Sequence, residues 1–150
     1  MNDLSRRAVE CKGWRWMPGM LIVTVGHQLD RIAAIDETHV HAWAESAQPT
    51  PRGLWLRYRL GRMDKHGGPD LTDAATLGCL LHLVRAAWGD HNIVTHTDLP
   101  LGQTEHTGEF AGCESWWVAV CDGETNDYSV LHYSGHSEAE ALVVALEAAP

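Results

Sequence analysis

Residues 54–60 read LWLRYRL, and this stretch decides what kind of sheet the chain can form. Its four even-numbered positions are leucine or tyrosine, and the positions between them are Trp55, Arg57 and Arg59. Period-two alternation of this kind is typical of a strand that buries one face and exposes the other. We therefore expect a strand over 54–60, with the tryptophan and both arginines on one face.

The second deciding stretch, residues 72–88, reads TDAATLGCLLHLVRAAW and predicts an amphipathic helix. Asp70 or Thr72 can cap the start of this helix, and Gly89 can end it. Its apolar residues recur at helical spacing and form one stripe, made of Leu77, Leu80, Leu81, Val84 and Trp88.

The rest of the chain supplies further strands and helices. A short helix is expected over 3–12, and a second amphipathic helix over 137–149, where Ser137 and Glu140 have capping-box spacing. Loops are expected at 45–53, 61–70 and 98–113. Strands are expected over 20–25, 30–35, 39–44, 92–97, 115–121 and 128–133, the last two as a hairpin. Because the strands do not alternate regularly with helices, the expected fold class is α+β, with an antiparallel sheet.

Length and composition favour one domain over residues 1–150, with a candidate seam in the Gly-rich loop 61–70. The N-terminal residues are polar, and the apolar run 20–25 is too short to span a bilayer. We therefore expect a cytoplasmic protein with no secretory signal and no membrane contact. The cysteines form no C-x-x-C pair and are expected to be reduced thiols: Cys11, Cys79, Cys113 and Cys121.

Charge is distributed unevenly along the chain. Residues 1–68 hold ten basic and seven acidic residues, whereas residues 69–150 hold thirteen acidic residues and one basic residue, Arg85. The acidic half should attract basic protein surfaces and repel nucleic acid, so direct binding of nucleic acid is not expected. The other interpretation is a charged surface that serves solubility. The candidate contacts with a basic partner are Glu105, Glu109, Glu114, Asp122, Glu124 and Asp127.

Neither catalysis nor metal binding has a motif in this sequence. The patterns G-x-S-x-G, G-x-G-x-x-G, H-E-x-x-H and the Walker loop are absent, so no catalytic residues are expected. Ten histidines invite a metal hypothesis, with His39 and His41 on one strand face and His132 and His136 four apart. Their spacing lacks the tight pairs of structural zinc sites, so we expect no metal and no cofactor. A small enzyme or metal protein stays an alternative.

The strongest binding pattern combines aromatic residues with arginines in the basic half of the chain. Arg side chains hold phosphate through bidentate hydrogen bonds, and both Arg and Trp stack on bases. The alternative is a half-exposed sheet on which Trp packs and Arg is solvated. The candidate ligand-binding residues are Trp14, Arg15, Trp16, Arg52, Trp55, Arg57 and Arg59.

Several stretches resemble small uncharacterised bacteriophage proteins of the α-β-α sandwich type. They are DLTDAATLGCLL at 70–81, AWGD at 87–90, WWVAV at 116–120, SEAEAL at 137–142 and GWRWMPGM at 13–20. The resemblance implies a phage or prophage origin, hence the cytoplasm of a bacterial host, and an accessory role. It assigns no functional residues.

Together these observations predict a phage-type binding protein without catalysis that counteracts a host defence. In the leading hypothesis it sequesters an anionic nucleotide-like signal, as a sponge, on the Trp and Arg residues. In the alternative, the acidic half blocks a host defence protein, in the manner of an anti-CRISPR inhibitor or a nucleic-acid mimic. The sequence leaves homo-oligomerisation open.

Overall fold

The computed structural model describes residues 2–44, 55–97, 116–121 and 130–150. The chain divides into two compact units, Met1–Cys79 and Leu80–Pro150, and the division falls within helix α3 (Ala74–Trp88). Each unit contains one antiparallel sheet in addition to helices. The predicted fold class, α+β with antiparallel strands, is confirmed. The expectation of one domain over 1–150 stays a prediction.

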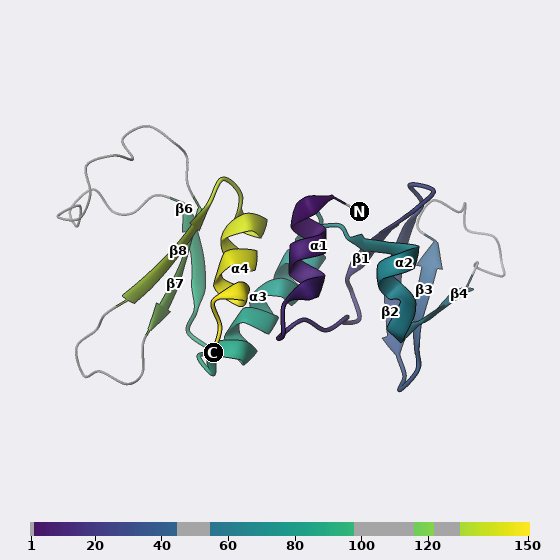
Figure 1. Cartoon of the computed structure of the whole chain (residues 1–150), viewed down its shortest axis with the longest axis horizontal. Helices are drawn as coiled ribbons and strands as arrows, with labels where there is room; N and C mark the ends of the chain where they lie inside the picture. Colours follow the sequence, from purple (N-terminus) through teal and green to yellow (C-terminus); the bar gives the residue numbers. More distant parts are fainter. Residues whose placement is uncertain (1, 45–54, 98–115, 122–129) are drawn as a thin grey trace. The chain divides into compact units, whose positions relative to one another are not determined.

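Five strands form the sheet of the first unit (Figure 1). They lie in the order β4-β3-β2-β1-β5, and every neighbouring pair is antiparallel. Successive hairpins therefore build most of the sheet, with β4 at one edge and β5 at the other. The strands are β1 (Leu21–Thr24), β2 (Leu29–Ile35), β3 (His39–Ala44), β4 (Trp55–Arg59) and β5 (Gly67–Pro69).

One face of this sheet carries the core of the first unit. Ile22, Ile32, Val40 and Ala42 lie on it and are at most 2% exposed. Helix α1 (Asp3–Glu10) packs against β5, where Ser5 Oγ donates a hydrogen bond of 2.8 Å to the carbonyl of Pro69. The side chain of Asn2 caps α1 by accepting from the Ser5 amide, as its place before the helix predicts.

The loop prediction for residues 61–70 is wrong. The 3-10 turn Leu60–Arg62 leads into the short helix α2 (Met63–His66), and Gly67–Pro69 pairs with β1 as strand β5. A Cβ at Gly67 would lie 2.2 Å from the carbonyl oxygen of Val23, so this close pairing requires glycine. Gly67, one of the glycines that suggested a loop, is there because two backbones meet.

Helix α3 begins two residues later than expected, because Asp73 is its cap. The Asp73 carboxylate accepts from the Thr76 amide at 2.9 Å, whereas Asp70 accepts from the Thr72 amide in the preceding turn. Gly89 ends the helix at φ +66°, as predicted. The buried stripe is rotated from the expected one: Leu80, Leu83 and Val84 are buried, but Leu77, Leu81 and Trp88 are only half-buried.

The second unit contains a three-stranded antiparallel sheet of β6 (Val94–Thr97), β7 (Trp116–Cys121) and β8 (Val130–Gly135), in that order. Helix α4 (Glu138–Glu147) packs on β7 and β8 (Figure 1). Ser137 caps it as predicted, because Ser137 Oγ accepts from the Glu140 amide, and the Glu140 carboxylate reaches back to accept from the amide of His136, one residue before the cap. The apolar stripe of α4 is buried as predicted: Ala139, Leu142, Val143 and Leu146.

Candidate functional site

The second face of the first sheet exposes aromatic and basic side chains on β3 and β4. The antiparallel register pairs Trp43 with Trp55, His41 with Arg57 and His39 with Arg59. Directly paired residues of an antiparallel ladder point to the same face, so these six side chains share one surface. We call it the Trp–Arg face, defined as His39, His41, Trp43, Trp55, Arg57 and Arg59.

Two tryptophans form one end of the Trp–Arg face. The ring centroids of Trp43 and Trp55 lie 3.8 Å apart with their planes inclined by 41°. Both rings also remain exposed, Trp43 by 39% and Trp55 by 57%. Large aromatic side chains bury 150–250 Å² each in cores and interfaces, so two exposed ones in contact form a surface suited to stacking a planar ligand.

A polar network follows beside the tryptophans. His41 Nε2 lies 2.9 Å from Asp36 Oδ2, and Arg57 Nη2 donates to His39 Nδ1 at 3.0 Å. The Asp36 carboxylate also accepts from the amides of Thr38 and His39. The His41 ring first, and then these amides, hold the pKa of Asp36 well below its usual range. Asp36 therefore stays ionised and fixes the β2–β3 turn from which the face is built.

Both arginines of the face are available to an anion. Arg57 and Arg59 are exposed, and no carboxylate that the structure describes lies within ion-pair distance of either. The Arg57 guanidinium is held in place by its bond to His39, which leaves its other N–H groups to a ligand. The face thus combines a stacking surface with two guanidinium groups.

Hydrogen bonds on the buried face of the same sheet hold the strands of the Trp–Arg face in position. Asp30 is fully buried and accepts hydrogen bonds from Gln28 Nε2 at 3.0 Å and from the hydroxyl of Tyr58 on β4. Burial, and then the bond to Asp30, raise the pKa of Tyr58 above its ordinary range, so the phenol stays a donor. Because Tyr58 lies between Arg57 and Arg59, this buried bond holds the strand that carries both.

The predicted ligand-binding residues divide into separate groups. Trp55, Arg57 and Arg59 share one face, as the alternation predicted. Trp14 and Trp16 contact each other edge to face, with centroids 5.5 Å apart, and Arg15 between them is exposed. No ring contact joins that pair to Trp55 in the part of the chain that the structure describes.

Seven of the predicted contacts lie outside the described residues. They are Arg52 and all the acidic partner-binding candidates, namely Glu105, Glu109, Glu114, Asp122, Glu124 and Asp127.

Three members of the face were not selected from the sequence as ligand-binding residues: His39, His41 and Trp43. His39, His41 and Trp43 alternate with Val40, Ala42 and Ala44 as strand residues do, and this was the available signal. What joins them to Trp55, Arg57 and Arg59 is the pairing of β3 with β4. This register is the one that places the alternating aromatic and basic residues of both strands on the same face.

Comparison of the chain with protein-family models, curated proteins and solved structures finds no match. Among the described residues, no three His, Cys, Asp or Glu side chains are grouped so that they could hold a metal ion. In the same residues, no helix has both the length and the hydrophobicity needed to cross a bilayer.

Proposed function

We propose that the Trp–Arg face binds an anionic nucleotide-like ligand and that the protein acts by sequestering it. The observation that carries this proposal is the exposed Trp43–Trp55 pair beside Arg57, which holds the next position of β4 on the same face. Base stacking on aromatic rings contributes about 1–3 kcal/mol per base. A charge-assisted hydrogen bond to phosphate adds roughly 1.5–3 kcal/mol.

Local charge supports an anionic ligand better than the charge of the whole chain does. The unit that carries the face, Met1–Cys79, holds ten basic and nine acidic residues, a net charge of +1. The unit Leu80–Pro150 holds one basic and eleven acidic residues, a net charge of −10. Arg57 and Arg59 therefore lie in the unit whose own charge does not oppose an anion.

Sequestration is the activity that fits an exposed binding face. It is also the role expected of a bacteriophage accessory protein that counteracts a nucleotide-dependent host defence, and that biological setting stays part of the proposal. The alternative, inhibition of a host protein through the acidic half, stays a prediction because all its proposed contacts lie outside the described residues.

Isothermal titration calorimetry against a panel of nucleotides tests the proposal. The panel contains nucleoside mono- and diphosphates, cyclic dinucleotides, ADP-ribose and short oligonucleotides. We expect at least one member to bind the natural protein. Its affinity for Arg57→Ala and for Arg59→Ala should be about tenfold lower.

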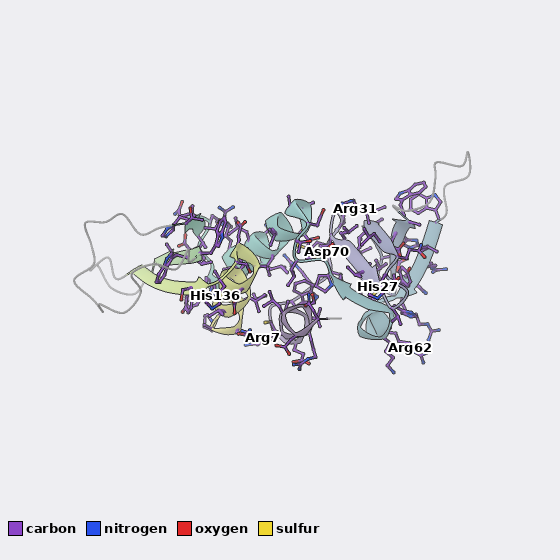
Figure 2. All side chains as sticks on the ribbon, turned by 90° about the horizontal axis from the view of Figure 1, so that it is seen from above. Arg7, His27, Arg31, Arg62, Asp70 and His136 are labelled. Carbon is purple, nitrogen blue, oxygen red and sulfur yellow. The ribbon has the colours of Figure 1, made fainter. Side chains whose placement is uncertain are left out.

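Arg62→Ala is the matched control, because it removes the same charge from the same unit. Figure 2 shows Arg62 and Arg31 on opposite sides of the strands, and Arg31 pairs in register with Trp43 of the face. Absence of binding across the panel, or equal losses in the Arg62 variant, would refute a specific role for the face.

A further inference from the structure

The Trp–Arg face is a linear row of three cross-strand pairs. Trp43–Trp55 comes first, His41–Arg57 second and His39–Arg59 third. Each step covers two residues of a strand, a distance of roughly 6.8 Å at the usual rise of antiparallel strands. One aromatic pair and two guanidinium groups therefore follow one another at regular intervals along β3 and β4.

We propose that the ligand is a single-stranded oligonucleotide that lies along β3 and β4, with a base stacked on the tryptophans and successive phosphates on Arg57 and Arg59. This inference rests on the proposed function and names the class of nucleotide. In an extended single strand, one nucleoside separates adjacent phosphates, so the phosphates repeat at a distance comparable to one step of the row. A single nucleotide has no second phosphate at that distance.

The exposure of the face favours a chain over a small molecule. Pockets for small ligands are concave and bury most of the ligand surface. Trp55 and Trp43 instead remain 57% and 39% exposed on the surface of a sheet. Proteins that bind single strands without sequence preference commonly combine aromatic stacking platforms with basic groups that follow the backbone.

Base stacking also selects single strands over duplexes. In a duplex the faces of the bases are covered by their neighbours, so Trp43 and Trp55 could stack only at an end. The expectation drawn from the sequence, that nucleic acid is repelled, rests on the acidic half of the chain, residues 69–150. The acidic excess belongs to residues 80–150, whereas the face lies in the unit of net charge +1.

Among the residues that the structure describes, Asp36 is an acidic group that bonds directly to this row, and its charge is already engaged. It bonds to His41 and accepts from the amides of Thr38 and His39. The phosphate contacts assigned to the ligand are those of Arg57 and Arg59. For two phosphates neutralised on a single strand, log K should fall against log salt concentration with a slope of about −1.4.

Fluorescence anisotropy of labelled (dT)8 and (U)8 tests the inference, with unlabelled dTMP and an eight-base-pair duplex as competitors. We expect (dT)8 or (U)8 to bind at least about tenfold more tightly than dTMP. Arg57→Ala and Arg59→Ala should each weaken binding about tenfold and reduce the salt slope by about 0.7. Arg62→Ala should leave both quantities unchanged.

The possible failures are distinguishable. If dTMP, or another single nucleotide or cyclic dinucleotide, binds as tightly as the octamers, the oligonucleotide inference falls and the proposed function stands. If the duplex competes better than the single strand, stacking on the tryptophans is not the mode of binding and the inference also falls. If no nucleotide binds at all, both proposals fall. Unchanged melting temperatures of the Arg variants would show that a loss of binding is not a loss of folding.

Discussion

Arg31 on β2 and Asp73 at the start of α3 form a bidentate ion pair, with Nη1–Oδ2 and Nη2–Oδ1 distances of 3.1 and 3.0 Å. The same carboxylate caps α3 by accepting from the Thr76 amide, and Arg31 also donates to the carbonyl of Gly19. Thr76 in turn donates its hydroxyl to Asp73 and accepts from the Leu21 amide of β1. One charged pair therefore fastens β1, β2 and the first turn of α3.

This pair predicts a defined loss of stability in acid. The Arg31 guanidinium holds the pKa of Asp73 at about 2, below the ordinary value of 3.8. Because the folded-state pKa is the lower one, the stabilisation is complete above about pH 4 and is lost as the pH falls toward about 2. Measurement of the free energy of unfolding by denaturant at several pH values between 2 and 6 tests this prediction.

Two variants separate the charge of Asp73 from its cap. Asn caps helices nearly as well as Asp, so Asp73→Asn removes the ion pair and keeps the cap, whereas Asp73→Ala removes both. We expect Asp73→Ala to cost about 1–3 kcal/mol at pH 7 and Asp73→Asn to cost less. Both should flatten the acid limb of the stability curve. An Asp73→Asn protein with the natural pH dependence would contradict this assignment.

Removal of the Tyr58 hydroxyl is expected to destabilise the sheet. Tyr58→Phe leaves the buried Asp30 carboxylate with Gln28 as its remaining side-chain donor in the described chain. An under-satisfied buried acceptor costs about 1–3 kcal/mol, and more when it is charged. Urea unfolding of Tyr58→Phe and of the double variant Tyr58→Phe/Asp30→Asn tests this. Recovery of stability in the double variant would show that the lost donor, and not lost packing, is responsible.

Gly67 is predicted to reject any side chain. Alanine there would place Cβ 2.2 Å from Val23 O and 2.9 Å from Thr24 Cα, which are backbone atoms that cannot move without breaking the β1–β5 pairing. Gly61 is the matched control, because nothing lies within 4 Å of its Cβ position. We expect Gly67→Ala to lower the thermal midpoint strongly and Gly61→Ala to leave it almost unchanged. Equal midpoints would mean that β5 does not pair with β1 as described.

The core of the second unit depends on α4. Leu142 is fully buried, so Leu142→Ala should cost about 2–5 kcal/mol, whereas Val94→Ala on β6, where the side chain is 50% exposed, should cost under about 1 kcal/mol. Denaturant unfolding of both variants measures the difference. Similar costs for the two would place Leu142 outside the core.

Local sequence patterns correctly predicted those helices and strands whose structure depends on residues close together in the chain. The alternation of residues 54–60 gave both the strand and its exposed face, and Ser137 with Glu140 gave the start of α4, because these signals act over a few residues. Residues 61–70 failed because strand β5 takes its structure from a partner, β1, more than forty residues earlier in the chain. Gly67 in this segment reflects a close approach of two backbones.

The sequence predicted one strand of the site and missed the other, because the pairing of the two strands is not a local property. Trp55, Arg57 and Arg59 were selected from one strand, and Trp43 joins them through the register of β3 with β4. Trp14 and Trp16 were grouped with them on composition, yet they pair with each other. Strand order and register are long-range properties, and a single sequence determines them weakly when the connecting segment is long.

The indole N–H signals of the tryptophans test the central claim most directly. In a two-dimensional ¹⁵N–¹H spectrum, assigned through Trp43→Phe and Trp55→Phe, we expect added (dT)8 to shift the signals of Trp43 and Trp55. The signal of Trp88, whose Nε1 donates to the Ala145 carbonyl at 2.9 Å, should stay in place. Shifts confined to Trp14 and Trp16, or a spectrum unchanged by saturating oligonucleotide, would contradict binding on the Trp–Arg face.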